Sequence, residues 1–462
     1  MTNKVLTYAI FLLIIFKLLA IYFTNFGLYG DEAQYWLWSK EPDLGYYSKP
    51  PLLAWFLSGY TGLFGSTFIS LKIFPIVVYL FILFSIYLLC QSLSFDKASA
   101  WLCALSFIVI PSASLSSFLI STDLLFLLFW VLSMIVLLNT INTNSNSNFL
   151  LLGLFLGLGF LSKYAAIYFV LSILLLLIID KKTLNSFKNN MVGVCVFLLS
   201  FLLVLSPNIW WNFNNDWVTL SHTSDNANLQ NLNLNIYEPI KFLGAQIIMV
   251  GPLLFISFIF FLKCFRLDFE NKFLLVFSLP ILLIVIIESF LVRANANWAA
   301  PALISVYIIL FRLVNNQKES LIKINFIFNY SVAVFLFLAI LFSFNNSLFD
   351  RIRGVDKFSK ELSLIIKGGD LVISDRIIFS NLSYQMRNKS NKIFTPHKMG
   401  APITNHFQLS SPLSAKRKNN FYLLGGPNDV SYLSNKHKSK LIKEYNVPFT
   451  SQRLKLYEVI FK

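Results

Sequence analysis

The chain has 462 residues, of which 56% are hydrophobic and 13% are charged, and its mean hydropathy is +0.66. A soluble globular protein carries roughly twice that charged fraction, so these values exclude an ordinary soluble enzyme and indicate a polytopic membrane protein. The net charge of +16 is concentrated after residue 345, because residues 346–462 contain twenty Lys or Arg against eight Asp or Glu and contribute +12.

The first apolar run, residues 5–23, contains Lys17 as its only charge and is long enough to cross a hydrocarbon core of about 30 Å. No small-residue cleavage site follows Phe23, so we interpret this run as a retained helix and not as a signal peptide. Apolar runs along the chain predict a mainly α bundle of eleven spans, near residues 5–23, 68–90, 98–115, 124–139, 149–162, 164–179, 191–206, 239–263, 273–292, 298–313 and 324–344.

One shorter apolar run, residues 51–64, is broken by Gly59 and Gly62 and predicts an interfacial or re-entrant helix. If this run crosses the membrane instead, the count rises, which gives a range of about 11 to 13 spans.

The distribution of Lys and Arg over the short loops predicts the orientation of the chain. With a cytoplasmic N-terminus, the inside loops around residues 97, 181–188, 263–272 and 312–323 carry most of the basic side chains. The acidic stretch after the first run, the loop 207–238 and the tail after residue 345 then all lie on the outer face.

The tail changes character after the last apolar run. Strand-like runs at residues 370–374, 392–395, 421–424 and 456–461 alternate with polar, helix-compatible stretches, which predicts a small α/β domain. We therefore predict a transmembrane domain at residues 1–345 and a periplasmic soluble domain at residues 346–462. The basic tail lies outside the cytoplasm in this topology, so anionic membrane lipid or a phosphorylated glycan is its expected partner and nucleic acid is not.

Carboxylates at the predicted outer rim are the strongest chemical signal. Asp31 and Glu32 directly follow the first apolar run, and Asp123 precedes the fourth. Ionisable groups at a bilayer edge are costly and are by default functional candidates, so Asp31 and Asp123 are predicted as catalytic residues. Glu32 is a substrate-binding candidate, and Glu32 or Asp123 could hold a divalent cation. The alternatives are that Asp123 caps its helix and that Asp31 and Glu32 begin an ordinary amphipathic surface helix.

Cations and aromatic side chains on the same face suggest a site for a sugar and a phosphate. Lys49, before two prolines, and Lys163, between two spans, are candidates for binding phosphate, although lysines at this depth also snorkel to lipid headgroups. The Trp- and Asn-rich outer loops suggest sugar binding or, alternatively, an interfacial aromatic belt; their candidate residues are Trp211, Asn212, His222, Asp225 and Trp298. No nucleotide-binding motif is present, which disfavours a nucleotide-driven pump.

Six motifs over about the first 310 residues resemble, in their order, those of a known family. They are Gly30–Trp38, Gly45–Leu52, Ser121–Asp123, Leu161–Tyr164, Pro207–Asn212 and Asn297–Pro301. The family is the polytopic, polyprenyl-phosphate-sugar-dependent glycosyltransferases of family 39, the protein O-mannosyltransferase group that includes the bacterial lipid A aminoarabinose transferase. The resemblance implies a membrane-embedded glycosyltransferase fold and an inverting transfer at the outer face of the membrane.

The same resemblance implies roles for single residues. Asp31 would match the acidic residue that positions or deprotonates the acceptor, and Asp123 would match the second acidic site. Lys49 would match the basic residue that contacts the donor phosphate, and Tyr46 lies in the same substrate-binding motif. Ser48 stands where the lipid A enzyme has a metal-linked glutamate, so the resemblance does not carry over a metal requirement.

These observations together predict a bacterial inner-membrane glycosyltransferase. The expected donor is a sugar on undecaprenyl phosphate, and the expected acceptor is lipid A or a related lipopolysaccharide at the periplasmic face. A protein O-mannosyltransferase or an O-antigen-decorating transferase is the alternative within this class. A lipid-linked sugar flippase or transporter is the alternative from another class; it predicts ionisable residues in mid-membrane and an internal repeat, whereas the carboxylates gather at one rim.

Overall fold

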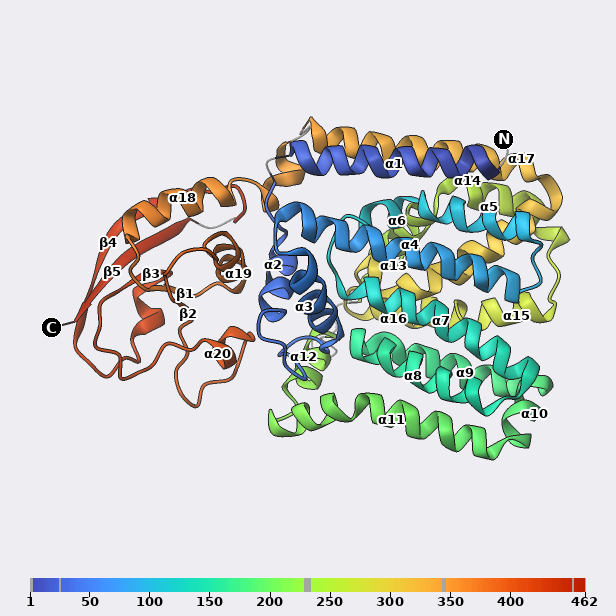
Figure 1. Cartoon of the computed structure of the whole chain (residues 1–462), viewed down its shortest axis with the longest axis horizontal. Helices are drawn as coiled ribbons and strands as arrows, with labels where there is room; N and C mark the ends of the chain where they lie inside the picture. The colour runs from blue at the N-terminus through green and yellow to red at the C-terminus, as the bar shows by residue number, and fades with distance from the viewer. Residues whose placement is uncertain (1–2, 25, 228–233, 343–345, 451–452, 462) are drawn as a thin grey trace. The chain divides into compact units, whose positions relative to one another are not determined.

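The computed structural model describes residues 3–24, 26–227, 234–342, 346–450 and 453–461. The chain divides into two compact units, each made from separate segments of the sequence (Figure 1). The first unit comprises residues 1–22, 49–53 and 71–338, and the second comprises residues 23–48, 54–70 and 339–462. The C-terminal tail therefore folds together with two N-terminal stretches, one of which contains the acidic motif that begins at Gly30.

The first unit is helical, as the apolar runs predict. Its elements in chain order are α1 (Asn3–Phe23), α4 (Phe68–Ser92), α5 (Lys97–Ile108), α6 (Pro111–Ser116), α7 (Thr122–Thr143), α8 (Asn146–Ser162), η1 (Tyr164–Ala166), α9 (Ile167–Ile179), α10 (Lys181–Asn189), α11 (Met191–Asn214), α12 (Val218–Ala227), α13 (Tyr237–Val250), α14 (Pro252–Phe261), η2 (Leu262–Cys264), α15 (Phe269–Val276), α16 (Leu279–Leu291), η3 (Ala296–Ala299) and α17 (Ala300–Leu341).

The predicted number of spans is not confirmed. In the described part of the chain, six helices are long and apolar enough to cross a membrane, or up to eight if each of two sharply bent helix pairs forms one span. The predicted runs 98–115 and 149–162 give the helices α5 and α8, of 12 and 17 residues. At 1.5 Å per residue these are about 18 and 26 Å long, shorter than a typical hydrocarbon core. An apolar run thus identifies a buried or lipid-facing helix without showing that the helix spans.

Two further departures come from backbone geometry. The run 239–263 is bent by 96° between α13 and α14. Gly251 makes this bend with φ of 110°, a left-handed conformation that side chains disfavour. Conversely, the run 298–313 from residue 300 onward and the run 324–344 up to residue 341 belong to one helix, α17, which is interrupted at Lys318 by non-helical dihedrals (φ −158°, ψ 86°). Residues 343–344 of the second run lie outside the described residues.

The predicted start of an outer loop at Pro207 is wrong, because α11 continues through this proline to Asn214. Asn208, Trp211 and Asn212 are buried, and their i, i+3, i+4 spacing puts them on one face of the helix. The Trp- and Asn-rich composition that suggests a loop therefore belongs to a helical face that contacts the rest of the unit.

The long helices differ in how much of their surface the unit covers. In the most apolar 18-residue segment of α7, 78% of the residues are buried inside the protein, whereas in the corresponding segment of α11 22% are buried. An apolar helix with an uncovered apolar face is typical of a protein whose surface contacts lipid, so α7 is interior and α11 peripheral. The two flank α8, where Gly153 allows close packing: a Cβ atom at this position would lie 2.0 Å from the Ser200 Oγ of α11.

The second unit contains the remaining elements. Its helices are α2 (Gly30–Trp38), α3 (Leu52–Phe64, whose first two residues belong to the first unit), η4 (Asn346–Ile352), α18 (Val355–Ile366), α19 (Arg376–Gln385), α20 (Phe407–Ser410) and η5 (Pro427–Val430). Its strands are β1 (Leu371–Ile373), β2 (Ile393–Phe394), β3 (Phe421–Leu424), β4 (His437–Tyr445) and β5 (Leu454–Phe461). They form one sheet in the order β2-β1-β3-β5-β4, parallel on the β2-β1-β3 side and antiparallel from β3 to β4.

Four of these strands lie where the sequence predicts strands, and β4 is the strand that the sequence analysis does not predict. β4 pairs on one side with β5 and has the sequence HKSKLIKEY, which is mostly exposed. A lysine-rich edge strand lacks the apolar alternation of an inner strand, and its charges discourage pairing with a further chain. The core of the sheet contains Val372, Leu413, Phe421, Leu423, Val430, Leu433 and Val459.

Candidate active site

Asp123 lies at the centre of a polar cluster in the first unit. It is in the first turn of α7, where its Oδ1 accepts a bond of 2.6 Å from the Lys163 Nζ and its Oδ2 accepts one of 3.0 Å from the Asn297 Nδ2. Lys163 connects α8 to η1, and Asn297 lies in η3, so three distant segments contribute. The side chains of Asp123 and Lys163 are 15% and 16% exposed, which leaves them reachable from solvent.

The structure does not make Asp123 the N-cap of its helix, as the alternative interpretation expects. The N-cap of α7 is Ser121, and the carboxylate of Asp123 points to a lysine and an amide from other elements. A charge-assisted bond to each oxygen fixes the orientation of the carboxylate and leaves lone pairs for a substrate hydroxyl.

A second polar network follows directly in sequence from Lys163. The Tyr164 hydroxyl donates to the Asn208 Oδ1 at 2.7 Å, and the Asn212 Nδ2 donates to the Tyr164 oxygen at 3.2 Å. Two of the predicted substrate-binding residues, Trp211 and Asn212, are thus buried on α11, with exposed fractions of 7% and 2%. Asn212 therefore contacts the residue that follows Lys163 in the sequence.

The other predicted catalytic carboxylate, Asp31, lies in the second unit. Its Oδ1 is 3.2 Å from the Arg376 NH1, and the same guanidinium nitrogen donates to the Gln34 Oε1 at 2.7 Å. Asp31 and Arg376 are 42% and 45% exposed, so this pair lies at the surface of the unit. Sequence reasoning missed Arg376, which is 345 residues from Asp31 and lies in the first turn of α19.

Glu32 and Tyr46 are less accessible than the substrate-binding prediction assumes. Glu32 is 1% exposed, and its Oε2 accepts a bond of 2.8 Å from the Tyr29 backbone N–H at the start of α2. Tyr46 is fully buried, stacks on Trp38 at a centroid distance of 4.3 Å and donates its hydroxyl to the Trp38 carbonyl. Most of α2 is buried, so the alternative of an amphipathic surface helix is wrong.

The remaining predicted residues have the following positions. Lys49 is half-buried and follows a two-residue turn, and Trp298 is half-buried in η3 beside Asn297. His222 is half-buried and Asp225 exposed on α12. Among the described residues, no group of three His, Cys, Asp or Glu side chains is arranged so that it could hold a metal ion.

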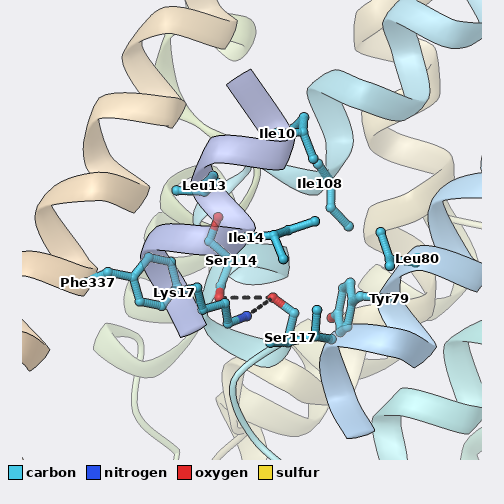
Figure 2. Close-up of a pocket in the computed structure, with 11 residues that line it drawn as sticks. Ile10, Leu13, Ile14, Lys17, Tyr79, Leu80, Ile108, Ser114, Ser117 and Phe337 are labelled. Carbon is cyan, nitrogen blue, oxygen red and sulfur yellow. Dashed lines mark hydrogen bonds between the residues drawn. The ribbon is translucent and has the colours of Figure 1, made fainter. Parts of the chain in front are cut away.

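A lysine in the apolar interior is a further feature of the first unit. Figure 2 shows Lys17 of α1, which is 4% exposed, at the polar end of a small cavity. Its Nζ donates to the Ser117 Oγ at 2.6 Å, and Ser117 in turn donates to the Ser114 carbonyl. The cavity volume is about 30 Å³, enough for a water molecule but not for a sugar. We therefore interpret Lys17 and Ser117 as a structural hydrogen bond between α1 and the end of α6.

Comparison with known proteins adds to this geometry. Residues 48–211 match the family model described as dolichyl-phosphate-mannose-protein mannosyltransferase. This segment contains Lys49, Asp123, Lys163 and Trp211. A curated relative, the lipid A galacturonosyltransferase RgtD of Rhizobium johnstonii, is 27% identical over 401 residues, which is 84% of each chain.

The fold has a solved counterpart. The crystal structure of ArnT from Cupriavidus metallidurans in the apo state aligns with a TM-score of 0.65 over 98% of this chain and 97% of that chain, at 10% identity. At this identity the likeness concerns the fold alone, and it extends over both units. The family resemblance predicted from the six motifs is confirmed.

Proposed function

Because this chain resembles the dolichyl-phosphate-mannose-protein mannosyltransferases and is a membrane glycosyltransferase, we propose that it transfers a sugar from undecaprenyl phosphate to lipid A or a related lipopolysaccharide. In this proposal the enzyme resides in the bacterial inner membrane with its N-terminus in the cytoplasm. Residues 1–345 form the transmembrane domain, and residues 346–462 form a periplasmic domain. The reaction takes place at the periplasmic face.

The observation that carries the proposal is the cluster of Asp123, Lys163 and Asn297. A carboxylate bonded at 2.6 Å by a lysine and at 3.0 Å by an amide, yet 15% exposed, is preorganised for binding a polar substrate. Asp123 and Lys163 lie in the segment that the family model matches. The relative named as a lipid A galacturonosyltransferase supports lipid A as the acceptor and makes galacturonic acid the first donor sugar to test.

The chemistry is a single displacement that inverts the anomeric carbon. The acceptor hydroxyl oxygen forms a bond to this carbon as the bond from the carbon to the phosphate oxygen breaks. The hydroxyl proton goes to the carboxylate of Asp31, which Arg376 orients, and the bonding electrons leave with undecaprenyl phosphate. Lys49 stabilises the leaving phosphate, and Asp123 with Lys163 positions the sugar. A phosphate leaves as a weakly basic anion, so no general acid is needed, in contrast to glycoside hydrolysis.

The direct test is mass spectrometry of lipid A from a deletion strain. We expect lipid A to lose the mass of one sugar, and we expect the wild-type gene to restore it while genes encoding Asp31→Asn or Asp123→Asn do not. Asp356→Asn is the matched control, because Asp356 is an exposed carboxylate on α18 paired with Lys360. Unchanged lipid A in the deletion strain would refute lipid A as acceptor; loss from glycoproteins or from O-antigen instead would identify the corresponding alternative acceptor.

Reconstitution of the purified protein in liposomes distinguishes a glycosyltransferase from the flippase or transporter alternative. Purified protein in liposomes that contain undecaprenyl-phosphate sugar and acceptor on the same side transfers the sugar if it is a glycosyltransferase. A flippase moves the lipid-linked sugar across the bilayer and leaves the acceptor unmodified. The same assay with and without a chelator tests whether a divalent cation takes part.

A further inference from the structure

An open cavity of about 480 Å³ lies in the second unit, and Asp31 is not among the residues that line it. It is lined by Trp36 of α2, Lys40 after α2, Ser66 and Thr67 after α3, and Arg387 and Asn388 after α19. The lining therefore contains two cations, two hydroxyls, one amide and an indole, and it contains no carboxylate. All six residues belong to one compact unit.

Neutral partners hold both cations in place. The Lys40 Nζ donates to the Ser66 Oγ at 2.8 Å and to the Thr61 Oγ1 at 3.2 Å, and it lies 5.4 Å from the centre of the Trp36 ring. The Arg387 guanidinium stacks on the Tyr384 ring at 4.1 Å, and its NH1 donates to the Tyr384 carbonyl at 2.7 Å.

The frame around the two cations is itself fixed. The Tyr384 hydroxyl donates to the Ser66 carbonyl at 3.2 Å, and the Trp36 and Tyr384 rings meet edge to face at 4.9 Å. These contacts join α2, the segment after α3 and α19, so the residues on which the two cations rest are held together by hydrogen bonds and ring packing. Preorganised donors of this kind lose little conformational entropy when a ligand binds.

In the described part of the chain, neither Lys40 nor Arg387 forms an ion pair with a carboxylate. The pKa of Lys40 is lowered, first by burial and then by the charge of Arg387, which means that the two cations repel each other. An anion bound in the cavity would offset the repulsion between these two like charges, so the arrangement favours an anionic ligand.

The donor set is best suited to a phosphate group. Arg387 retains guanidinium N–H groups beyond the one bonded to Tyr384, Lys40 has a third ammonium proton, and Thr67 and Asn388 add a hydroxyl and an amide. A phosphate monoester offers three oxygens and nearly two negative charges, so it can use donors from several directions where a carboxylate can use two oxygens only.

We propose that this cavity binds a phosphate monoester of the acceptor glycan and so positions the acceptor for sugar transfer. The inference rests on the proposed function, because it concerns the acceptor of that reaction. The indole of Trp36 at the cavity edge provides an apolar surface of the kind that packs against a sugar ring. The phosphate of an anionic membrane lipid has the same chemistry, so the test must separate these two sources.

The test measures KM for phosphorylated and dephosphorylated lipid A with the full-length enzyme in nanodiscs made only of zwitterionic lipid. We expect the wild type to prefer the phosphorylated acceptor by about tenfold or more, as charge-assisted bonds to a phosphate allow, and the double variant Lys40→Gln/Arg387→Gln to lose this preference. The matched control Lys389→Gln/Lys438→Gln removes the same charge from exposed positions of the same unit and should retain the preference.

A binding measurement makes the result independent of catalysis. Calorimetric titration of the full-length protein with a phosphorylated glucosamine disaccharide should show binding that the double variant loses and the control retains. An unchanged KM ratio in the double variant, or an equal loss in the control, would overturn the proposal. If adding anionic lipid to the nanodiscs abolishes the preference of the wild type, the cavity binds lipid headgroups and the acceptor assignment is wrong. A wild type that binds the disaccharide but transfers no sugar would contradict the proposed function and not this site.

Discussion

The stability of the second unit should depend on pH through His406. This side chain precedes α20 and packs edge to face against the rings of Trp38 and Tyr46, at centroid distances of 5.4 Å and 4.9 Å. Its Nδ1 faces the Tyr47 backbone N–H at 3.5 Å, which favours the neutral ring with Nδ1 as acceptor. Burial lowers the pKa of His406 to about 4, against a smaller opposite effect of Asp43.

The sign and size of the effect follow from this pKa. In the unfolded chain a histidine titrates near pH 6.5, so between about pH 4 and 6.5 the unfolded state binds more protons than the folded state. The contribution of His406 to the free energy of unfolding is therefore fully present above about pH 6.5 and is lost as the pH falls from there to about 4. A shift of about 2.5 pKa units at 1.36 kcal/mol per unit corresponds to about 3 kcal/mol of unfolding free energy for this one group.

The assay is hydrogen exchange of the full-length protein in detergent between pH 4 and pH 7, with rates corrected for the intrinsic pH dependence of exchange. The opening free energy of α19 and α20 should fall by about 3 kcal/mol over this range in the wild type. His406→Phe preserves the ring packing but cannot be protonated, so its opening free energy should depend less on pH by that amount. His437→Phe, at the start of the edge strand β4, is the control and should behave as the wild type. Identical pH profiles for the wild type and His406→Phe would refute the reasoning.

Three further substitutions test single contacts by thermal unfolding of the purified protein. Gly30→Ala should destabilise the second unit by about 1–3 kcal/mol, because its Cβ would lie 2.4 Å from the Ile377 Cγ2, and an unchanged midpoint would show that α2 and α19 can separate at no cost. Lys163→Met should cost about 3 kcal/mol by leaving the shielded carboxylate of Asp123 without its cation, and Lys163→Arg should restore part of this; equal midpoints for both variants would argue against the ion pair. Asp96→Ala should cost about 1 kcal/mol, since this carboxylate caps α5 by accepting two backbone N–H bonds, and a larger loss would point to a further role.

Local signals suffice where a pattern is decided by neighbouring residues. The apolar runs correctly predict the helices α1, α4 and α7. Exposing a long apolar segment to water is unfavourable, so protein or lipid must cover it along its length. The strands β1, β3 and β5 likewise follow from runs of apolar residues bounded by turns. Such runs fail for β4, whose exposed lysines face solvent at the sheet edge, and for α11, whose proline does not end the helix.

The candidate site divides in the same way. The class of protein and the candidates Asp31, Asp123 and Lys163 can be identified from the sequence, since charges next to apolar runs are visible along the chain. The contact of Asp123 with Asn297, 174 residues away, and that of Asp31 with Arg376, 345 residues away, exist only in the folded chain. The burial of Glu32 and Tyr46 is likewise a property of the fold. A side chain's role depends on which distant groups share its environment, and burial, ion pairs and cavities arise only when those segments pack together.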